Sequence, residues 1–286
     1  MSVTFYPSYF HYAGFDATAE PSVTPQQYAC SGGEATGAAY DLVDNNNNNV
    51  ITIDTNGETG SFYVDFDLTT AITGANFAIV DNHNLKTADA NIGLSHDNPS
   101  VLVTVTGQWS GPLGSTLTAE SESSEYIINP TDGVLLFTFT AAPENTGWTF
   151  EIYDTGSDNF DADVTMGEMA IGISFTPSMS PDIGVPRGYE YGIDTQESYS
   201  GQTYAFERYG LKKSWRLNWK YLSTTDKTGF ETLFAVLKNS KHPFWIDLGE
   251  TSPPTLYFVR IVENSVTLTE ITGSAYSLGL TIEEVL

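Results

Sequence analysis

The sequence predicts an all-β protein, with an N-terminal antiparallel jelly-roll sandwich followed by a second β-sandwich domain that carries one flanking α-helix. Three observations predict this fold. Aromatic residues make up 13% of the 286 residues and charged residues only 16%, and together with many Thr, Ser, Asn and Gly residues this is typical of short strands joined by turns. Runs of alternating apolar and polar residues recur along the chain. Only one stretch has convincing helical periodicity.

The charge divides the chain into two regions. The whole chain holds 11 Lys and Arg residues against 36 Asp and Glu residues, a formal net charge of -25. The first 186 residues contain 24 acidic residues and one basic residue, Lys86, whereas the last 100 contain 12 acidic and 10 basic residues. Because so negative a chain repels phosphate backbones and anionic lipids, we expect no nucleic-acid partner and no membrane insertion.

Composition and proline placement predict four segments. The Pro-rich segment SFTPSMSPDIGVP is expected to interrupt strands and helices and to link two domains. The segments are an irregular N-terminal arm and loop at 1–49, an acidic jelly roll at 50–176, a linker at 177–187 and a second sandwich at 188–286.

Alternation predicts the strands of the first domain. In FYVDFDL, residues 62–68, Phe and Val alternate with Tyr and Asp, so one face is expected to be buried and the other wet. The remaining strands are expected at 76–80, 101–106, 134–140, 148–153 and 169–175.

The second domain combines an aromatic strand with a helix. In KSWRLNWKYL, Trp215, Leu217, Trp219 and Tyr221 are expected to share one face. Apolar residues at 230, 233, 234 and 237 then follow helical spacing, which predicts a helix at about 225–239 with capping residues in STTD. Further strands are expected at 243–249, 256–262, 265–271 and 276–285.

Motifs that carry catalysis are absent from the sequence. There is no nucleophile elbow, phosphate-binding loop, zinc-protease motif or paired-cysteine motif, so we expect no enzyme. The single cysteine, Cys30, excludes an intrachain disulfide, and we interpret it as a small buried hydrophobe. The N-terminus lacks the pattern of a signal peptide, which indicates synthesis as a soluble cytosolic chain.

No cofactor is expected, with Ca²⁺ as the one ion to consider. The stretch DTGSDNFDAD, residues 154–163, contains Asp158, Asp161 and Asp163, and carboxylate oxygens are the ligands that Ca²⁺ takes. Because the order of an EF-hand loop is missing, a solvated acidic loop is the preferred interpretation.

A cluster of amides around a histidine follows the strand at 76–80. Asp81, Asn82, His83 and Asn84, together with Trp109 in the loop TGQWSGP, are candidate glycan contacts, because sugars stack on aromatic rings and bond planar amides. The alternative, which we favour, is a turn held by bonds from these side chains to nearby backbone amides.

Two resemblances bear on function. The segment NFAIVDNHNLKTADANI, with the later WTFEIYD and MGEMAIG, resembles jelly-roll domains of the galactose-binding kind in phage virion proteins, over residues 50 to 175. That resemblance implies glycan recognition and carries over to His83 and Asn84. The last 100 residues, through SGQTYAFERYGLKKSWRLNWKYL and the helix TGFETLFAVLK, resemble tail-tube-type domains of phage distal tail and baseplate proteins.

These resemblances imply a virion structural protein, a distal-tail, baseplate or tail-tip ring subunit of a particle assembled in the host cytoplasm. The expected partners are copies of itself, other virion tail proteins and host surface glycans. Arg208, Arg216 and Lys220 are candidate ring contacts, because complementary charge fixes the register of partners. A stand-alone carbohydrate-binding module or host-adsorption lectin is the alternative, and a polysaccharide-degrading enzyme is the third.

Overall fold

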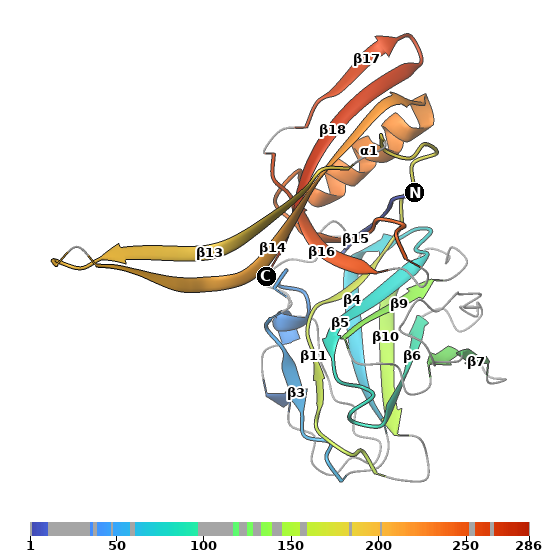
Figure 1. Ribbon diagram of the computed structural model, residues 1–286. Coiled ribbons are helices and arrows are strands. Elements are labelled where there is room, and N and C mark those ends of the chain that lie inside the picture. The colour runs from blue at the N-terminus through green and yellow to red at the C-terminus, as the bar shows by residue number, and fades with distance from the viewer. Residues whose placement is uncertain are drawn as a thin grey trace. The chain divides into compact units, whose positions relative to one another are not determined.

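A computed structural model describes most of the chain in two compact units (Figure 1). The described residues are 2–10, 35–36, 39–46, 48–57, 61–96, 117–119, 125–127, 133–138, 145–154, 159–182, 185–200, 202–251, 255–263 and 266–285. Unit 1 consists of Met1–Phe5, Phe175–Gly249 and Tyr257–Leu286, and unit 2 of Tyr6–Ser174 and Glu250–Leu256. Antiparallel strands dominate, with one helix among the described residues, so the predicted all-β class with a flanking helix is confirmed.

Unit 2 is built from three antiparallel sheets. The largest has the order β4 (Ser61–Ile72), β10 (Asn145–Asp154), β6 (Ala90–His96), β8 (Glu125–Ile127) and β7 (Leu117–Ala119). The second has the order β11 (Val164–Met166), β3 (Ile51–Ile53) and β2 (Ala35–Thr36), and the third β12 (Met169–Gly172), β5 (Phe77–His83) and β9 (Gly133–Thr138). A 3-10 turn, η1 (Ala39–Leu42), precedes β3.

Aromatic side chains join these sheets into one core. Phe66 on β4 and Phe150 on β10 are buried neighbours, with ring centroids 5.9 Å apart. Phe150 also lies 6.3 Å from the ring of Phe137 on β9, which belongs to another sheet. The buried places of Val64 and Phe66 agree with the alternation read from the sequence. The expected strand at 101–106 lies outside the described residues.

Unit 1 is a seven-stranded sheet with a helix on one face. Its order is β1 (Thr4–Pro7), β15 (Phe244–Asp247), β16 (Leu256–Ile261), β18 (Ala275–Glu284), β14 (Thr203–Leu222) and β13 (Arg187–Glu197), and β17 (Leu268–Thr272) pairs with β18. The segment expected to be an irregular arm thus supplies strand β1, whose Phe5 is fully buried. Four residues are too few for alternation to predict a strand.

The helix α1 (Thr224–Leu237) matches the prediction closely. Ser223 caps its N-terminus and forms a reciprocal capping box with Asp226. It ends because Lys238 and Asn239 adopt left-handed backbone, with φ of 49° and 59°. Its apolar stripe packs on the sheet, where the ring of Phe230 lies 5.2 Å from that of Trp219 on β14. No helix in the described ranges has both the length and the apolarity needed to cross a bilayer.

The aromatic strand differs from its prediction at one position. Trp215, Leu217 and Trp219 are buried as expected, but Tyr221 is 62% exposed. The register of β14 against β18 shifts between Trp219 and Leu222, so Leu222 takes the buried place that strict alternation assigned to Tyr221.

Candidate functional site: the β13–β14 hairpin

The hairpin formed by β13 and β14 extends beyond the rest of the unit 1 sheet (Figure 1). Strand β14 has 20 residues, and its pairing with β18 covers only Ser214–Leu222. Its first part, from Thr203 to Lys213, pairs with β13 alone. A two-stranded ribbon without a covering layer is at best marginally stable in water.

The hairpin carries most of the exposed apolar side chains. Eleven large apolar side chains are exposed among the described residues, and seven of them lie in this hairpin: Tyr189, Tyr191, Ile193, Tyr199, Tyr204, Phe206 and Tyr209. Exposed apolar side chains gathered on one element in this way are typical of interaction sites. Aromatic side chains are also enriched at the centres of protein interfaces.

Strand register divides these side chains between two faces, because directly opposed residues point to the same side of a ribbon. Arg187 lies opposite the buried Trp215, so its face continues the core side of the sheet. We call this the core-side face, and on β13 it carries Tyr189, Tyr191 and Ile193. The opposite, outer face carries Tyr204, Phe206 and Tyr209.

Two bulges lie in the middle of the hairpin. Tyr191 pairs with Leu211, Gly192 with Tyr209, and Ile193 with Glu207, so β14 contains two extra residues, Arg208 and Gly210. Bulges bend a strand and increase its twist. The hairpin is therefore divided into a base next to the sheet and a distal arm.

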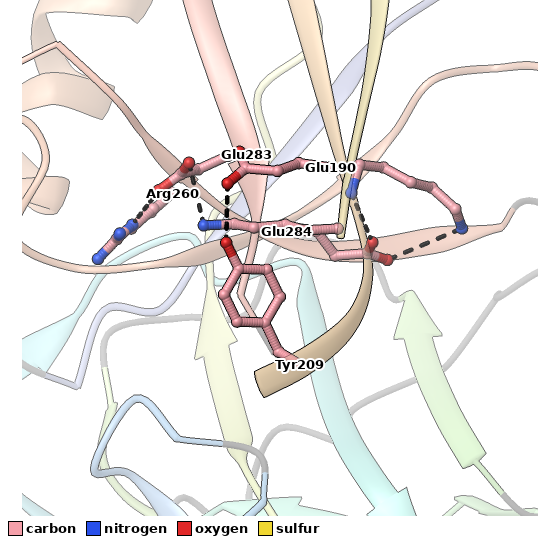
Figure 2. Close-up of polar contacts among 7 residues, drawn as sticks. Glu190, Tyr209, Arg260, Glu283 and Glu284 are labelled. Carbon is pink, nitrogen blue, oxygen red and sulfur yellow. Dashed lines mark hydrogen bonds and ion pairs between the residues drawn. The ribbon is translucent and has the colours of Figure 1, made fainter. Parts of the chain in front are cut away.

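Ion pairs hold the base of the hairpin to the sheet (Figure 2). The Glu283 carboxylate lies 3.0 Å from Lys212 Nζ and accepts a hydrogen bond of 2.7 Å from Arg260 Nε. Burial alone would raise the pKa of Glu283, but the bonds and charges of Lys212 and Arg260 outweigh it, so that pKa is lowered. Glu284 accepts a hydrogen bond of 3.2 Å from the Lys213 N–H.

Figure 2 also draws a polar contact of Tyr209 on the outer face. The Tyr209 hydroxyl donates a hydrogen bond of 2.8 Å to Glu190 on β13. This bond to a carboxylate raises the pKa of Tyr209, because it favours the protonated phenol.

The three predicted assembly residues all lie on β14. Arg208 pairs with Asp194 across the hairpin at 2.7 Å, and Lys220 pairs with Asp182 at 3.1 Å. The Arg216 side chain is exposed on the polar face of the sheet, and its N–H donates to the Pro186 carbonyl. Sequence reasoning thus found charged groups near the surface but missed the exposed aromatics of the hairpin. The alternation in YEYGI was a signal for a strand, not for its exposure.

In unit 2, Asp81, Asn82 and His83 end strand β5, and Asn84 leads into the turn that follows. Asp81 Oδ1 accepts the Asn82 N–H at 2.7 Å, and His83 Nδ1 accepts the Leu85 N–H at 3.3 Å. Asp81 and His83 are buried, whereas Asn82 is exposed with a φ of 51°.

Asn84 ties this turn to strand β11. Its Nδ2 donates to the Asp163 carbonyl at 2.8 Å, and its Oδ1 accepts the Thr165 N–H at 2.7 Å. These contacts give the amide cluster a structural role at a corner. Trp109, the fifth candidate, lies outside the described residues.

The structure describes two of the three candidate calcium ligands. Asp158 lies outside the described residues, and the Asp161 side chain is exposed. Asp163 Oδ1 accepts the N–H groups of Thr55 and Asn56 at 3.2 and 3.1 Å. In the part of the chain that the structure describes, no three His, Cys, Asp or Glu side chains are grouped so as to hold a metal.

A buried carboxyl lies beneath the Asn-rich loop of unit 2. Glu168 is 1% exposed, and its Oε2 accepts the Asn45 N–H at 2.9 Å. Burial, with the nearby charge of Asp44 as a smaller cause, raises the pKa of Glu168 well above its usual value. The loop therefore covers an acid that favours its neutral form.

No family model and no curated protein sequence matches the chain. Among the features that the structure describes, the exposed aromatic side chains of the unit 1 hairpin are the ones that packing within a single copy does not explain.

Proposed function

We propose that this chain is a self-assembling structural protein of a phage virion, a distal-tail, baseplate or tail-tip ring subunit that assembles through unit 1. One observation carries the proposal: a ribbon of two strands bears seven exposed large apolar side chains and extends past the sheet to which it belongs. Such a ribbon gains stability when a partner covers it. The placement in a phage particle, assembled in the host cytoplasm, rests on the sequence resemblances.

The composition of the hairpin supports a protein partner. Tyr supplies large contact area with few rotatable bonds, and hot spots of interfaces are enriched in it. The charged groups Arg208 and Asp194 neutralise each other within the hairpin, as an apolar contact surface requires. A nucleic acid would need unpaired basic groups there. The proposal includes no catalytic role and no cofactor.

The test measures the size of the purified full chain by light scattering and native mass spectrometry. A triple variant, Tyr191→Ser, Ile193→Ser and Phe206→Ser, removes apolar area from the hairpin and should shift the assembly toward monomer. Tyr221→Ser is the matched control, because Tyr221 is equally exposed but lies outside the hairpin arm. Near-ultraviolet circular dichroism checks that the variants stay folded. A wild-type chain that is monomeric at all concentrations would overturn the proposal.

Glycan binding by unit 2 is the alternative function. Experiments on the same purified samples distinguish it from self-assembly. Of the candidate contacts, Asn82 is the exposed one with a described side chain. A monomer that is retained on a glycan array would support a lectin. Electron microscopy with an antibody against this chain would place it on the particle, at the tail if the proposal holds.

A further inference from the structure

We infer that the core-side face of the distal arm of one copy lies on the polar face of the unit 1 sheet of the next copy, where Glu207 of the arm pairs with the partner's Arg216. This inference rests on the proposed function in requiring self-association, and it names the two surfaces that meet. Each surface carries an exposed charge without an ion pair among the described residues, and the two charges are of opposite sign.

The distal arm carries acidic groups that are left without a basic partner. Its ion pair among the described residues joins Arg208 to Asp194. Glu197 and Glu207 are exposed, and neither forms an ion pair with a described residue. Both lie on the core-side face, where Glu207 is directly opposite Ile193, a side chain that is 57% exposed. The arm thus presents a carboxylate beside an exposed apolar side chain.

The polar face of the sheet, which is the side away from α1, presents the opposite charge. Arg216 is exposed there, and its neighbour on β18 is Thr281. The Thr281 carbonyl in turn accepts the N–H of Val262, which follows β16. Because Ile261 is buried in the core, alternation turns Val262 to the polar face, where it is 46% exposed. This face thus presents a guanidinium near an exposed apolar side chain.

The other basic side chains around Arg216 already have acidic partners within the chain. These pairs are Lys212 and Arg260 with Glu283, and Lys220 with Asp182. The Glu263 carboxylate accepts the Thr281 N–H at 3.1 Å, so it is held at the edge of β18. Within the described part of this face, Arg216 is therefore the cation that is left for a carboxylate from outside.

Glu207 and Arg216 cannot meet within one copy. They lie on the same strand, β14, where a rise of about 3.3 Å per residue separates them by roughly 30 Å. Their side chains also point to opposite sides, since Glu207 shares the core-side face with Ile193 and Arg216 shares the polar face with Thr281. Such charges can neutralise each other only between copies.

The contact is head-to-tail, because each copy uses its arm on one neighbour and its polar face on the other. Such a heterologous contact closes into a ring when the rotation between copies allows it. Two core-side faces would not suit each other, because both carry the carboxylates of Glu197 and Glu207 and like charges repel. Contact between Ile193 and the partner's Val262 adds apolar area beside the ion pair.

Charge reversal tests this contact in the full chain. Glu207→Lys alone and Arg216→Glu alone each place like charges against each other and should weaken the association constant on the order of tenfold. An equimolar mixture of the two variants should recover association, because the altered arm then meets the altered face and the native arm meets the native face. The double variant Glu207→Lys with Arg216→Glu should recover it as well. Analytical ultracentrifugation measures the association constants.

Controls separate this inference from the proposed function. Glu270→Lys on β17 and Lys241→Glu after α1 are matched changes of charge at exposed positions outside both surfaces, and they should leave association unchanged. Thermal melting of each variant shows whether unit 1 is folded. Assembly that is insensitive to both reversals, or loss that neither mixing nor the double variant repairs, overturns the contact of arm and polar face while the assembly proposal stands. A wild-type chain that never associates overturns both.

Discussion

The ring of Tyr209 lies directly over Gly192 on the neighbouring strand of the hairpin. A Cβ placed at Gly192 would stand 2.3 Å from the ring, well inside the distance that side chains adopt. The absence of a side chain at this one position allows the tyrosine to lie across the ribbon and reach Glu190.

Gly192→Ala should therefore displace Tyr209 and break its bond to Glu190. We expect the hairpin to lose about 1–3 kcal/mol of local stability, the usual cost of overpacking. Hydrogen exchange of the β13 and β14 amides measures this. Gly210→Ala is the matched control, since nothing lies within 4 Å of a Cβ there. Equal protection in both variants would contradict the expected role of Gly192.

Glu283→Gln should loosen the base of the hairpin. The lost ion pairs with Lys212 and Arg260 are partly exposed, so the expected loss in the free energy of unfolding at neutral pH is only about 0.5–1 kcal/mol. Because the pKa of Glu283 is lowered by folding, its contribution is present above about pH 4.5 and disappears as the pH falls through the folded value. Urea unfolding at pH 7 and at pH 3 compares the two proteins.

The difference in the free energy of unfolding between wild type and Glu283→Gln should thus be smaller at pH 3 than at pH 7. Glu231→Gln on α1 is the control, because its partner Lys227 is one turn away on the same exposed helix face. A Glu283→Gln variant as stable as wild type at pH 7 would show that the base is held by the strand pairing alone.

Glu168→Gln should stabilise unit 2 at neutral pH. Folding raises the pKa of Glu168. The wild type is therefore most stable at low pH, where Glu168 is protonated in both the folded and the unfolded state. Its free energy of unfolding falls as the pH rises above the pKa that Glu168 has in the unfolded chain. The amide keeps an oxygen for the Asn45 N–H without the cost of burying a charge. We expect a gain on the order of 1 kcal/mol at pH 7 and none near pH 4.

Thermal unfolding of wild type and Glu168→Gln between about pH 4 and pH 7 measures this difference in stability. Asp161→Asn removes an exposed carboxylate of the same unit and should not reproduce the effect. A loss of stability at pH 7 in Glu168→Gln would mean that the ionised form is the one the Asn-rich loop holds.

Asp226→Ala should destabilise unit 1, because it removes hydrogen bonds to both Ser178 and Ser223. Its carboxylate accepts the N–H and hydroxyl of Ser178 at 2.8 and 2.6 Å and also those of Ser223 at 3.0 and 2.7 Å. Burial would raise the pKa of Asp226, but these bonds lower it on balance, so the contribution is lost as the pH falls below about 3.8. We expect a loss of about 1–3 kcal/mol at pH 7 in urea unfolding.

Ser178→Ala provides the comparison for this site. It removes one of the four bonds and leaves the capping box intact, so the loss should be smaller than in Asp226→Ala. Equal losses would assign the whole effect to the contact between Ser178 and Asp226 instead of the helix cap.

The sequence predicted the interior of this protein better than its surface. Periodicity located α1 and the buried face of Trp215, Leu217 and Trp219, because alternating burial leaves a pattern in the residue types. It failed at Tyr221, where a bulge shifts the alternation. Alternation reports which side chains share a face, and it does not report whether another layer covers that face.

For the same reason the candidate sites were only partly foreseen. The turn around Asn84 could be read from its amides, since such side chains often bond the backbone. The exposed ribbon could not, because Tyr191 and Ile193 have the pattern of a strand buried in a sandwich. The bulges at Gly192 depend on the register in which the two strands of the hairpin pair, which local propensity does not contain.

Those bulges also protect the molecule. From Thr203 to Lys213, β14 has a free edge, and an uninterrupted row of backbone amides and carbonyls there would invite a foreign strand to add and begin a fibril. The irregular spacing at Arg208 and Gly210 breaks that row into short pieces. The arm can thus present exposed aromatic side chains while its β14 edge remains a poor template for amyloid growth.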